Sequence, residues 1–267
     1  MLLTIDCGNT NIVFALHRGE TQLASWRTVS DSRKTVDELV SWLYPLMQLE
    51  GYQPSDVTGA ILASVVPAAR RALEGLCQKL FGLLPLVVGT EAVRLGVPVR
   101  VDRPEQVGAD RLVNAVAAYA RFGGDLVVID FGTATTFDVI ARDGAYEGGV
   151  IAPGINLSME ALHNASALLP RITVQQPERV IGKATIPAME SGVFWGYIGM
   201  IEGMISRIQA EYGAEMTVIA TGGLAPLFER ATEVIDHLDS DLTLRGLRMI
   251  YELNVNKRNI DGRTRGK

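Results

Sequence analysis

Leu126-Val127-Val128-Ile129-Asp130-Phe131-Gly132-Thr133-Ala134-Thr135-Thr136 is an apolar run that ends in Asp, Gly and small hydroxyl residues. The same pattern occurs near the start of the chain, at Leu2-Leu3-Thr4-Ile5-Asp6-Cys7-Gly8-Asn9-Thr10. Each copy predicts a buried strand, a tight turn and a returning strand, the returns being residues 12–16 and 136–140. Because the copies lie about half a chain apart, we expect two lobes that face each other.

The residues at these two turns are typical of phosphate binding. Glycine lets the backbone approach a phosphate closely, N–H groups of the turn donate to its oxygens, and an Asp carboxylate holds the neutralising metal ion. A single Asp-x-Gly turn is common in α/β proteins, because Asp and Gly are ordinary turn residues. Two matching copies instead predict a nucleotide-binding cleft.

A third apolar strand runs into Thr221-Gly222-Gly223. Such a sequence lets the backbone pass beside a flat ligand and places a helix start near it. Its position after the two hairpins resembles the order of elements in the actin-like ATPases and sugar kinases, where the third element lies against adenosine. The chain has no Gly-x-x-x-x-Gly-Lys-Ser/Thr motif, so a Walker-type phosphate loop is not expected.

Composition restricts the class of protein further. With 267 residues, of which 48% are apolar, the chain can bury a core in one or two domains. The net charge of −5 argues against nucleic-acid binding. Asp6 interrupts the apolar start, and no segment has the about 18 apolar residues of a membrane span, so we expect a cytoplasmic protein without a membrane partner. Cys7 and Cys77 match neither a disulfide framework nor a metal spacing.

The apolar spacing predicts strands and helices that alternate along the chain. Thr35 is the expected N-cap of a helix that reaches Met47, and Pro67 is expected to begin another. Further strands are predicted at 60–66, 86–88 and 216–220, a turn at Gly148-Gly149, and helices at 108–122, 157–169, 187–212 and 244–253. These elements predict lobes at residues 1–115 and 116–254, followed by a disordered basic tail at 255–267.

The segment Pro104-Glu105-Gln106-Val107-Gly108-Ala109-Asp110-Arg111-Leu112 lies between the two hairpins in the sequence. Asp110 and Arg111 begin a helix whose later apolar residues form a buried stripe. An acidic first turn favoured by the helix dipole, with a solvated Arg111, explains them locally. At this place in the chain, however, a carboxylate beside a guanidinium also suits an acceptor alcohol and an anionic substrate group.

These motifs together resemble type III pantothenate kinase, in the order of that family and over residues 2 to about 254. The matching residues are Asp6-x-Gly8-Asn9-Thr10, Trp26-Arg27, Thr35-x-Asp37-Glu38, Ser64-Val65-Val66-Pro67, Gly108-Ala109-Asp110-Arg111, Asp130 to Thr136, Gly148-Gly149, Pro153-Gly154, Ala167-x-Leu169-Pro170, Gly182-Lys183-Ala184-Thr185, Ser191-Gly192 and Thr221-Gly222-Gly223-Leu224. The resemblance implies two ribonuclease-H-like lobes of the actin-like ATPase and sugar kinase superfamily. It also implies phosphorylation of pantothenate by ATP, the first step of coenzyme A biosynthesis.

The resemblance implies a role for each matching residue. Asp110 matches the catalytic base, and Gly108, Ala109, Asp110, Arg111 and Thr185 match pantothenate contacts. The ATP contacts correspond to Asp6, Cys7, Gly8, Asn9, Thr10, Asn11, Ile12, Val13 and Thr133. Asp130 corresponds to the ligand of a monovalent cation, K⁺ or NH₄⁺, and Asp6 is a candidate ligand of Mg²⁺. The family is a homodimer whose substrate sites lie at the subunit interface.

Two residues depart from the family pattern, and two other functions remain open. Val101 stands where many members have Tyr beside pantothenate, and Ala15 where the first hairpin often returns through Gly. One alternative is a nucleotide-binding regulatory protein of the same fold without kinase activity. Another is a kinase for a different small hydroxy compound. The intact Gly108 to Arg111 stretch favours the pantothenate kinase, because a regulator needs no acceptor base.

The remaining features are interpreted structurally. His17, His163 and His237 share no motif with other ligand residues, so satisfied or solvated histidines are expected rather than metal ligands. Apolar residues on the helix predicted at 187–212 form a wider face than one surface stripe needs, and Ile201 is among them. This breadth predicts either a helix buried within one lobe or a dimer interface.

Overall fold

The computed structural model describes residues 1–165 and 169–264, with side chains described up to residue 255. The chain forms two compact units. The first comprises Met1–Pro98, Asp102–Ala120 and the chain from Leu242 onward, and the second comprises Val99–Val101 and Arg121–Asp241. The two lobes expected from the sequence are continuous, whereas these units are not, because the last helix packs with the first unit.

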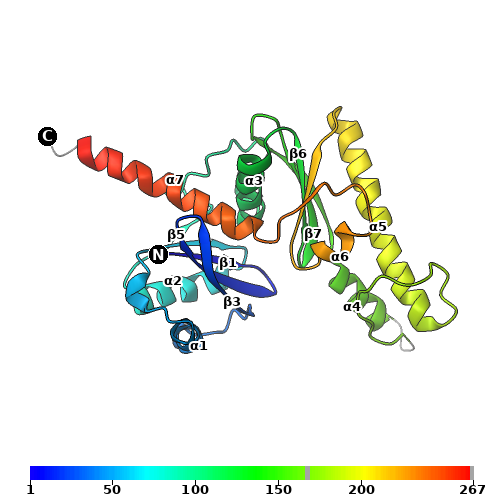
Figure 1. The fold of residues 1–267 in the computed structure, drawn as a ribbon, viewed down its shortest axis with the longest axis horizontal. Helices are drawn as coiled ribbons and strands as arrows, with labels where there is room; N and C mark the ends of the chain where they lie inside the picture. The colour runs from blue at the N-terminus through cyan, green and yellow to red at the C-terminus, as the bar shows by residue number, and fades with distance from the viewer. Residues whose placement is uncertain (166–168, 265–267) are drawn as a thin grey trace. The chain divides into compact units, whose positions relative to one another are not determined.

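The first unit contains a mixed sheet of order β3-β2-β1-β4-β5 (Figure 1). Its strands are β1 (Leu2–Cys7), β2 (Asn11–Arg18), β3 (Thr21–Val29), β4 (Gly59–Ser64) and β5 (Leu86–Val87). β1, β2 and β3 are antiparallel neighbours, and β4 and β5 run parallel to β1. The register pairs Asp6 with Val13 and Cys7 with Ile12, as a tight hairpin requires.

Helices cover both faces of this sheet. Leu3 and Ile5 of β1 pack against α1 (Val36–Leu49) and α2 (Pro67–Phe81). Ile61 and Ala63 of β4 pack against α3 (Ala109–Phe122) and α7 (Leu242–Thr264) on the other face. In Figure 1, α1 and α2 lie on one side of the blue strands and α7 on the other. Because successive side chains of a strand point to opposite faces, apolar residues of this sheet contribute to the core on both sides of it.

α1 and α2 begin where the sequence predicts, because local capping residues determine their first turns. The Thr35 side chain accepts the N–H of Glu38 at 3.2 Å, and the Glu38 carboxylate accepts the N–H of Thr35 at 2.7 Å. This reciprocal capping box satisfies two donors that a helix start would otherwise leave unpaired. Pro67 is the first residue of α2, where its missing N–H costs nothing. Short 3-10 turns occur at Pro54–Asp56 and Pro104–Gln106.

The second unit repeats the strand order of the first. Its sheet is β10-β9-β6-β7-β8, built from β6 (Leu126–Phe131), β7 (Ala134–Ile140), β8 (Tyr146–Pro153), β9 (Thr217–Thr221) and β10 (His237–Leu238). As in the first unit, the first three strands in sequence are antiparallel neighbours, and the last two run parallel to the central strand. The predicted duplication of an α/β lobe is confirmed by this topology.

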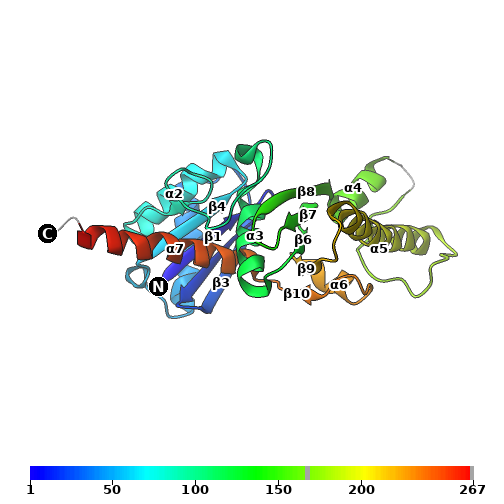
Figure 2. The same cartoon turned by 90° about the horizontal axis from the view of Figure 1, so that it is seen from above.

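The helices of the second unit are α4 (Ile155–Ala165), α5 (Thr185–Tyr212) and α6 (Ala225–Glu229). Figure 2 shows α5 from above beside this sheet. Phe194, Ile198, Ile201 and Ile205 of α5 are buried among side chains of the sheet and α6. Ile201 is fully buried, so at this residue the broad apolar face is core.

Three details differ from the sequence predictions. Gly148 and Gly149 do not form a turn but lie within β8, paired with Val139 and Asp138, where a register shift accommodates Gly148 at φ +119°. The helix predicted at 157–169 ends at Ala165, and residues 166–168 lie outside the described residues. The last helix, predicted at 244–253, runs from Leu242 to Thr264 and so includes most of the predicted disordered tail, while 265–267 are not described.

Candidate active site

The first hairpin exposes main chain where a phosphate is expected. The N–H of Gly8 donates to the carbonyl of Asn11 at 3.0 Å and closes the turn, in which Asn9 and Thr10 are exposed. Cys7 and Ile12 are each 1% exposed, because both side chains point into the core under α1 and α2. Of the predicted ATP contacts, these two residues therefore offer a ligand their main chain alone.

Neighbouring segments hold this hairpin in place. The N–H of Ser30, after β3, donates to the carbonyl of Thr10 at 2.9 Å. The N–H of Val65, after β4, donates to the carbonyl of Cys7 at 3.1 Å. Burial raises the pKa of the Cys7 thiol, so the side chain stays a neutral part of the core.

The start of α3 holds the Asp110 carboxylate in a defined position. Gly108 caps the helix, since its carbonyl accepts the N–H of Leu112 at 3.3 Å. Asp110 Oδ1 accepts the N–H of Arg111 at 2.8 Å. A Cβ on Gly108 would lie 2.5 Å from Asp110 Oδ1 and 3.7 Å from a methyl carbon of Val65. Only a residue without a side chain leaves the carboxylate where it is, close to the segment that supports the first hairpin.

The environment of Asp110 favours proton uptake. Burial raises the pKa of its carboxyl group, and the Arg111 main chain and guanidinium oppose this effect without cancelling it. A carboxylate with a raised pKa is a stronger base than an ordinary surface Asp. The sequence places Asp110 in the first turn of a helix, but only the folded environment determines this shift.

The second hairpin repeats the geometry in the second unit. Asp130 pairs with Thr136, and the N–H of Gly132 donates to the carbonyl of Ala134 at 3.0 Å. Gly132 and Thr133 at the tip are exposed. Thr133 is therefore placed where a ligand can reach it.

Two glycines surround the Asp130 carboxylate. A Cβ on Gly222 would lie 2.7 Å from Asp130 Oδ1, and one on Gly132 would lie 3.7 Å from the same atom. Gly222 also has φ +93°, which a residue with a side chain rarely adopts. The segment Thr221-Gly222 thus packs directly on the turn after Asp130, and the predicted third glycine-rich element joins this site.

Thr185 is the first residue of α5 and is exposed. The loop before it packs closely on the helix, because a Cβ on Gly182 would lie 2.3 Å from the main-chain nitrogen of Ala188. The Ser191 hydroxyl donates to the carbonyl of Val180 and fixes the same loop. The Gly182 and Ser191 motifs therefore present Thr185 at the start of α5.

Buried polar groups beside the second hairpin have no role that the sequence motifs predict. Asp138 is fully buried, and its carboxylate accepts the hydroxyls of Tyr146 at 2.8 Å and Thr136 at 3.0 Å. Tyr197 of α5 is 7% exposed and donates its hydroxyl to the carbonyl of Pro153. Both contacts join residues whose proximity depends on strand register and helix packing, so spacing in the sequence gives no signal for them.

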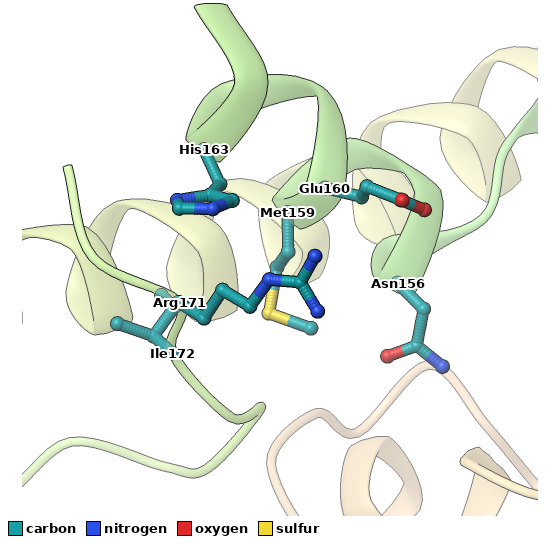
Figure 3. Close-up of a pocket in the computed structure, with 6 residues that line it drawn as sticks. All are labelled: Asn156, Met159, Glu160, His163, Arg171 and Ile172. Atoms are coloured by element: carbon teal, nitrogen blue, oxygen red, sulfur yellow. The ribbon is translucent and has the colours of Figure 1, made fainter. Parts of the chain in front are cut away.

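A separate polar pocket of about 210 Å³ lies beside α4 (Figure 3). It is lined by Asn156, Met159, Glu160, His163, Arg171 and Ile172. His163 Nδ1 lies 2.6 Å from the carbonyl of Leu169, and since a carbonyl only accepts, Nδ1 carries the proton. None of the residues predicted to contact ATP or pantothenate lines this pocket.

The other two histidines lie apart from the predicted site residues. His17 is buried with Nε2 3.0 Å from the Thr4 hydroxyl, and the ring of His237 stacks on Phe122. Within the described residues, no cluster of three or more His, Cys, Asp or Glu side chains is arranged to bind a metal ion. Among the described helices, none combines the length and apolar character needed to cross a membrane.

Comparison of the sequence with known proteins finds one family, both by its family model and by individual relatives. The family model described as type III pantothenate kinase matches residues 2–207. A type III pantothenate kinase of Paramagnetospirillum magneticum is 59% identical over 95% of this chain and 98% of its own length. The protein of the same description from Rhodospirillum rubrum is 56% identical over 95% of this chain and 99% of its own length.

Solved structures of other proteins have a fold similar to that of this chain. A candidate transcriptional activator of the Baf family from Campylobacter jejuni superposes with a TM-score of 0.62 at 20% identity, covering 95% of this chain and 99% of that one. The ethanolamine utilization protein EutJ from Carboxydothermus hydrogenoformans gives 0.55 at 16% identity, covering 92% and 88%. These neighbours have the fold of actin-like ATPases and sugar kinases, which confirms the predicted fold class.

Proposed function

The chain belongs to the type III pantothenate kinase family, and from this premise we propose roles for the residues of its active site. Its activity is the transfer of the γ-phosphoryl group of ATP to pantothenate, the first step of coenzyme A biosynthesis. The observation that carries the assignment of roles is the Asp110 carboxylate, held over Gly108 with a raised pKa.

Asp110 is the proton acceptor. The primary hydroxyl oxygen of pantothenate forms a bond to the γ-phosphorus, the bond from that phosphorus to the bridging oxygen breaks, and ADP leaves. The hydroxyl proton passes to the Asp110 carboxylate. Because the proton leaves late in a loose phosphoryl-transfer transition state, a carboxylate can act as base without deprotonating the alcohol beforehand. Burial of Asp110 strengthens it for this task.

The remaining pantothenate contacts are Gly108, Ala109, Arg111 and Thr185. The Arg111 guanidinium suits the carboxylate of pantothenate, because paired charge-assisted hydrogen bonds are the strong ones. Exposure of Thr185 at the start of α5 leaves its hydroxyl available to a substrate. Val101 faces Gly148 within the second unit, its methyl carbon 3.8 Å from where a Cβ on Gly148 would lie, so the pantothenate wall differs here from members with Tyr.

The ATP contacts are Asp6 to Val13 and Thr133. Exposed turns at Asn9-Thr10 and Gly132-Thr133 support this assignment, since turn N–H groups are the donors that phosphates accept. For Cys7 and Ile12 the contact is through the main chain, because their side chains are buried in the core.

Two carboxylates are the proposed cation ligands. Asp130 would hold K⁺ or NH₄⁺, and the glycines at 132 and 222 keep Cβ atoms away from its oxygen. Asp6 would hold Mg²⁺ together with substrate phosphates, which is how Mg²⁺ is commonly bound, by one or two carboxylates. Bound there, the cations would supply the positive charge that offsets the phosphates.

The second unit also carries the surface for a homodimer. Large apolar side chains are exposed on α4, on the loop before α5 and on its first turn, namely Leu157, Leu162, Val180, Ile181 and Ile186. α4 contacts α5, and the loop that carries Val180 and Ile181 packs on the first turns of α5 through Gly182 and the Ser191 hydroxyl. An apolar surface of this kind marks a protein interface. Thr185 lies next to Ile186 within it, which supports a pantothenate site that is completed at the subunit interface.

One assay tests the proposal as a whole. Purified protein with ATP, Mg²⁺, K⁺ and pantothenate should form ADP and phosphopantothenate in equal amounts, and omission of pantothenate should abolish ADP formation. Replacement of K⁺ by Na⁺ should lower the rate strongly if Asp130 holds a monovalent cation. Equal rates in both salts would remove the cation from the mechanism.

The alternative of a regulatory protein without kinase activity predicts ATP binding with no product in this assay. The likeness to the Campylobacter jejuni chain supports the fold alone at 20% identity. No contact of Asp110 or Thr185 favours that alternative.

We also propose that the enzyme works in the cytoplasm, where its substrate ATP is made.

A further inference from the structure

Tyr197 reaches from α5 to the last residue of β8. Its ring is stacked on Phe228, with centroids 5.7 Å apart and planes at 24°, and its side chain is 7% exposed. Its hydroxyl donates to the carbonyl of Pro153. The hydroxyls of Thr135 and Ser158 also lie within hydrogen-bonding reach of the phenol.

The carbonyl of Pro153 and the N–H of Gly154 belong to one peptide group. The N–H of Gly154 donates to the carbonyl of Thr133 at 3.1 Å. Because a peptide group is planar, a hydrogen bond that orients its carbonyl also orients its N–H. The Tyr197 hydroxyl is therefore connected to the Thr133 turn by two hydrogen bonds on opposite ends of a rigid plane.

The packing at Gly154 shows how tightly this peptide supports the turn. A Cβ on Gly154 would lie 2.1 Å from the carbonyl oxygen of Thr133 and 2.8 Å from that of Gly132. The Ser158 hydroxyl donates to the carbonyl of Gly154 at 3.1 Å and holds the other side of the same residue. A small rotation of the Pro153–Gly154 peptide would thus move the exposed tip of the second hairpin.

We propose that Tyr197 is a positioning residue for the Thr133 turn, acting through the Pro153–Gly154 peptide group. The inference rests on the proposed ATP contact of Thr133. The role of Tyr197 is to set the orientation of the turn that contacts ATP, without contact to ATP itself. If the tyrosine were purely structural and only satisfied a buried carbonyl, its substitution would lower stability. The KM values for ATP and pantothenate would then stay as they are in the wild type.

The test is Tyr197→Phe in the full chain, which removes the hydroxyl and keeps the ring. We expect the KM for ATP to rise about tenfold, because ATP binding must then also order the turn that the hydroxyl no longer holds, while the KM for pantothenate stays within about twofold. Phe228→Leu is the matched control for stability, since it removes the stacking partner and leaves the hydroxyl in place. It should lower the melting temperature without a selective effect on ATP.

Two further variants sharpen the result. Tyr212→Phe makes the same change at the last residue of α5, where the hydroxyl donates to Asp125 at 2.9 Å, and both KM values should stay unchanged. Gly154→Ala displaces the turn directly and should also raise the KM for ATP. The double variant with Tyr197→Phe should show less than the product of the two effects, because both act on one peptide group.

Hydrogen exchange separates this inference from the proposed function. A non-hydrolysable ATP analogue should protect amides of residues 132–135 in the wild type, and less so in Tyr197→Phe. Absence of protection in the wild type would remove the ATP contact of Thr133 and the inference with it. Equal protection in both proteins, or a rise of both KM values together in Tyr197→Phe, would overturn the inference and leave the ATP contact standing.

Discussion

The Asp110 carboxylate occupies space that a side chain at position 108 would take, with Oδ1 only 2.5 Å from a Cβ built on Gly108. Gly108→Ala must therefore displace the carboxylate. Misplacement of a reacting group by about 1 Å can cost about 100-fold in rate, so we expect kcat to fall roughly 10- to 100-fold. Since a flexible side chain can move away, the free energy of unfolding should change by less than about 1 kcal/mol. Steady-state kinetics with urea unfolding measures both, and an unchanged kcat would contradict this steric role.

Removal of the proposed base tests Asp110 itself. Asp110→Asn keeps the size of the side chain and its acceptor oxygen for Arg111, but cannot take up the hydroxyl proton. Loss of a general base costs about 10²- to 10⁴-fold in rate, and ATP affinity should stay near that of the wild type. Glu105→Gln is the matched control, an exposed residue with the same change of charge. A folded Asp110→Asn enzyme with wild-type turnover would assign the base to another residue.

At the scale of elements, His17 of β2 is buried and is influenced by the charges of two arginines of α7, so it resists protonation. Thr4 donates to the carbonyl of Ala15 at 3.4 Å, so its hydroxyl oxygen is left to accept from His17 Nε2. Burial, together with the charges of Arg248 and Arg245 on α7, lowers the pKa of His17 from 6.5 to about 4. Glu252 is 2.7 Å and Glu20 3.8 Å from Arg248, which keeps that arginine paired.

This arrangement predicts how stability depends on pH. In the unfolded chain His17 takes up a proton as the pH falls below 6.5, whereas the folded protein resists protonation down to about 4. The stability contributed by keeping His17 neutral is therefore present above pH 6.5 and is lost as the pH falls toward 4. For this residue alone, the free energy of unfolding should fall by about 2 kcal/mol between pH 7 and pH 5. Urea unfolding at both pH values measures it, and His17→Gln should reduce the difference between them. The same pH dependence in both proteins would show that other groups cause it.

Element packing also assigns the broad apolar face of α5 to two roles, a buried core in one part of the helix and a proposed dimer interface in another. Ile201 lies in the core of the second unit, so Ile201→Asp would unfold that unit rather than separate subunits. The first turn of α5 and the loop before it carry exposed apolar residues instead, among them Ile186 and Ile181. The amphipathic pattern alone cannot separate these two parts of the helix, because both are apolar.

At the scale of the whole molecule, the proposed dimer gives a direct prediction. Ile181 is 79% exposed, so Ile181→Asp should leave the subunit folded while it places a charge in the interface. Sedimentation at assay concentrations should show a monomer, and activity should fall together with the dimer because the pantothenate site is incomplete. Leu84→Asp, at a residue of the first unit that is 70% exposed, is the matched control and should remain an active dimer. A fully active Ile181→Asp monomer would show that each subunit builds its own site.

Much of this molecule follows from sequence alone, because its signals are local. The two Asp-x-Gly hairpins, the capping box of Thr35 with Glu38 and the start of α2 at Pro67 depend on residues a few positions apart. Their repetition predicted the duplicated fold, and the motifs predicted the family. The same local motifs contain Asp6, Asp110 and Asp130, and the roles of these residues stay predictions.

Only the tertiary structure decided how those residues are held. The pKa of Asp110 depends on burial, the space above Gly108 depends on a side-chain rotamer, and the contact of Tyr197 with Pro153 spans 44 residues. Gly148 and Gly149 belong to a strand because β7 supplies a paired partner, which outweighs their local preference for a turn. Local spacing specifies turns and helix ends, whereas burial, register and long-range hydrogen bonds exist only once the chain has packed.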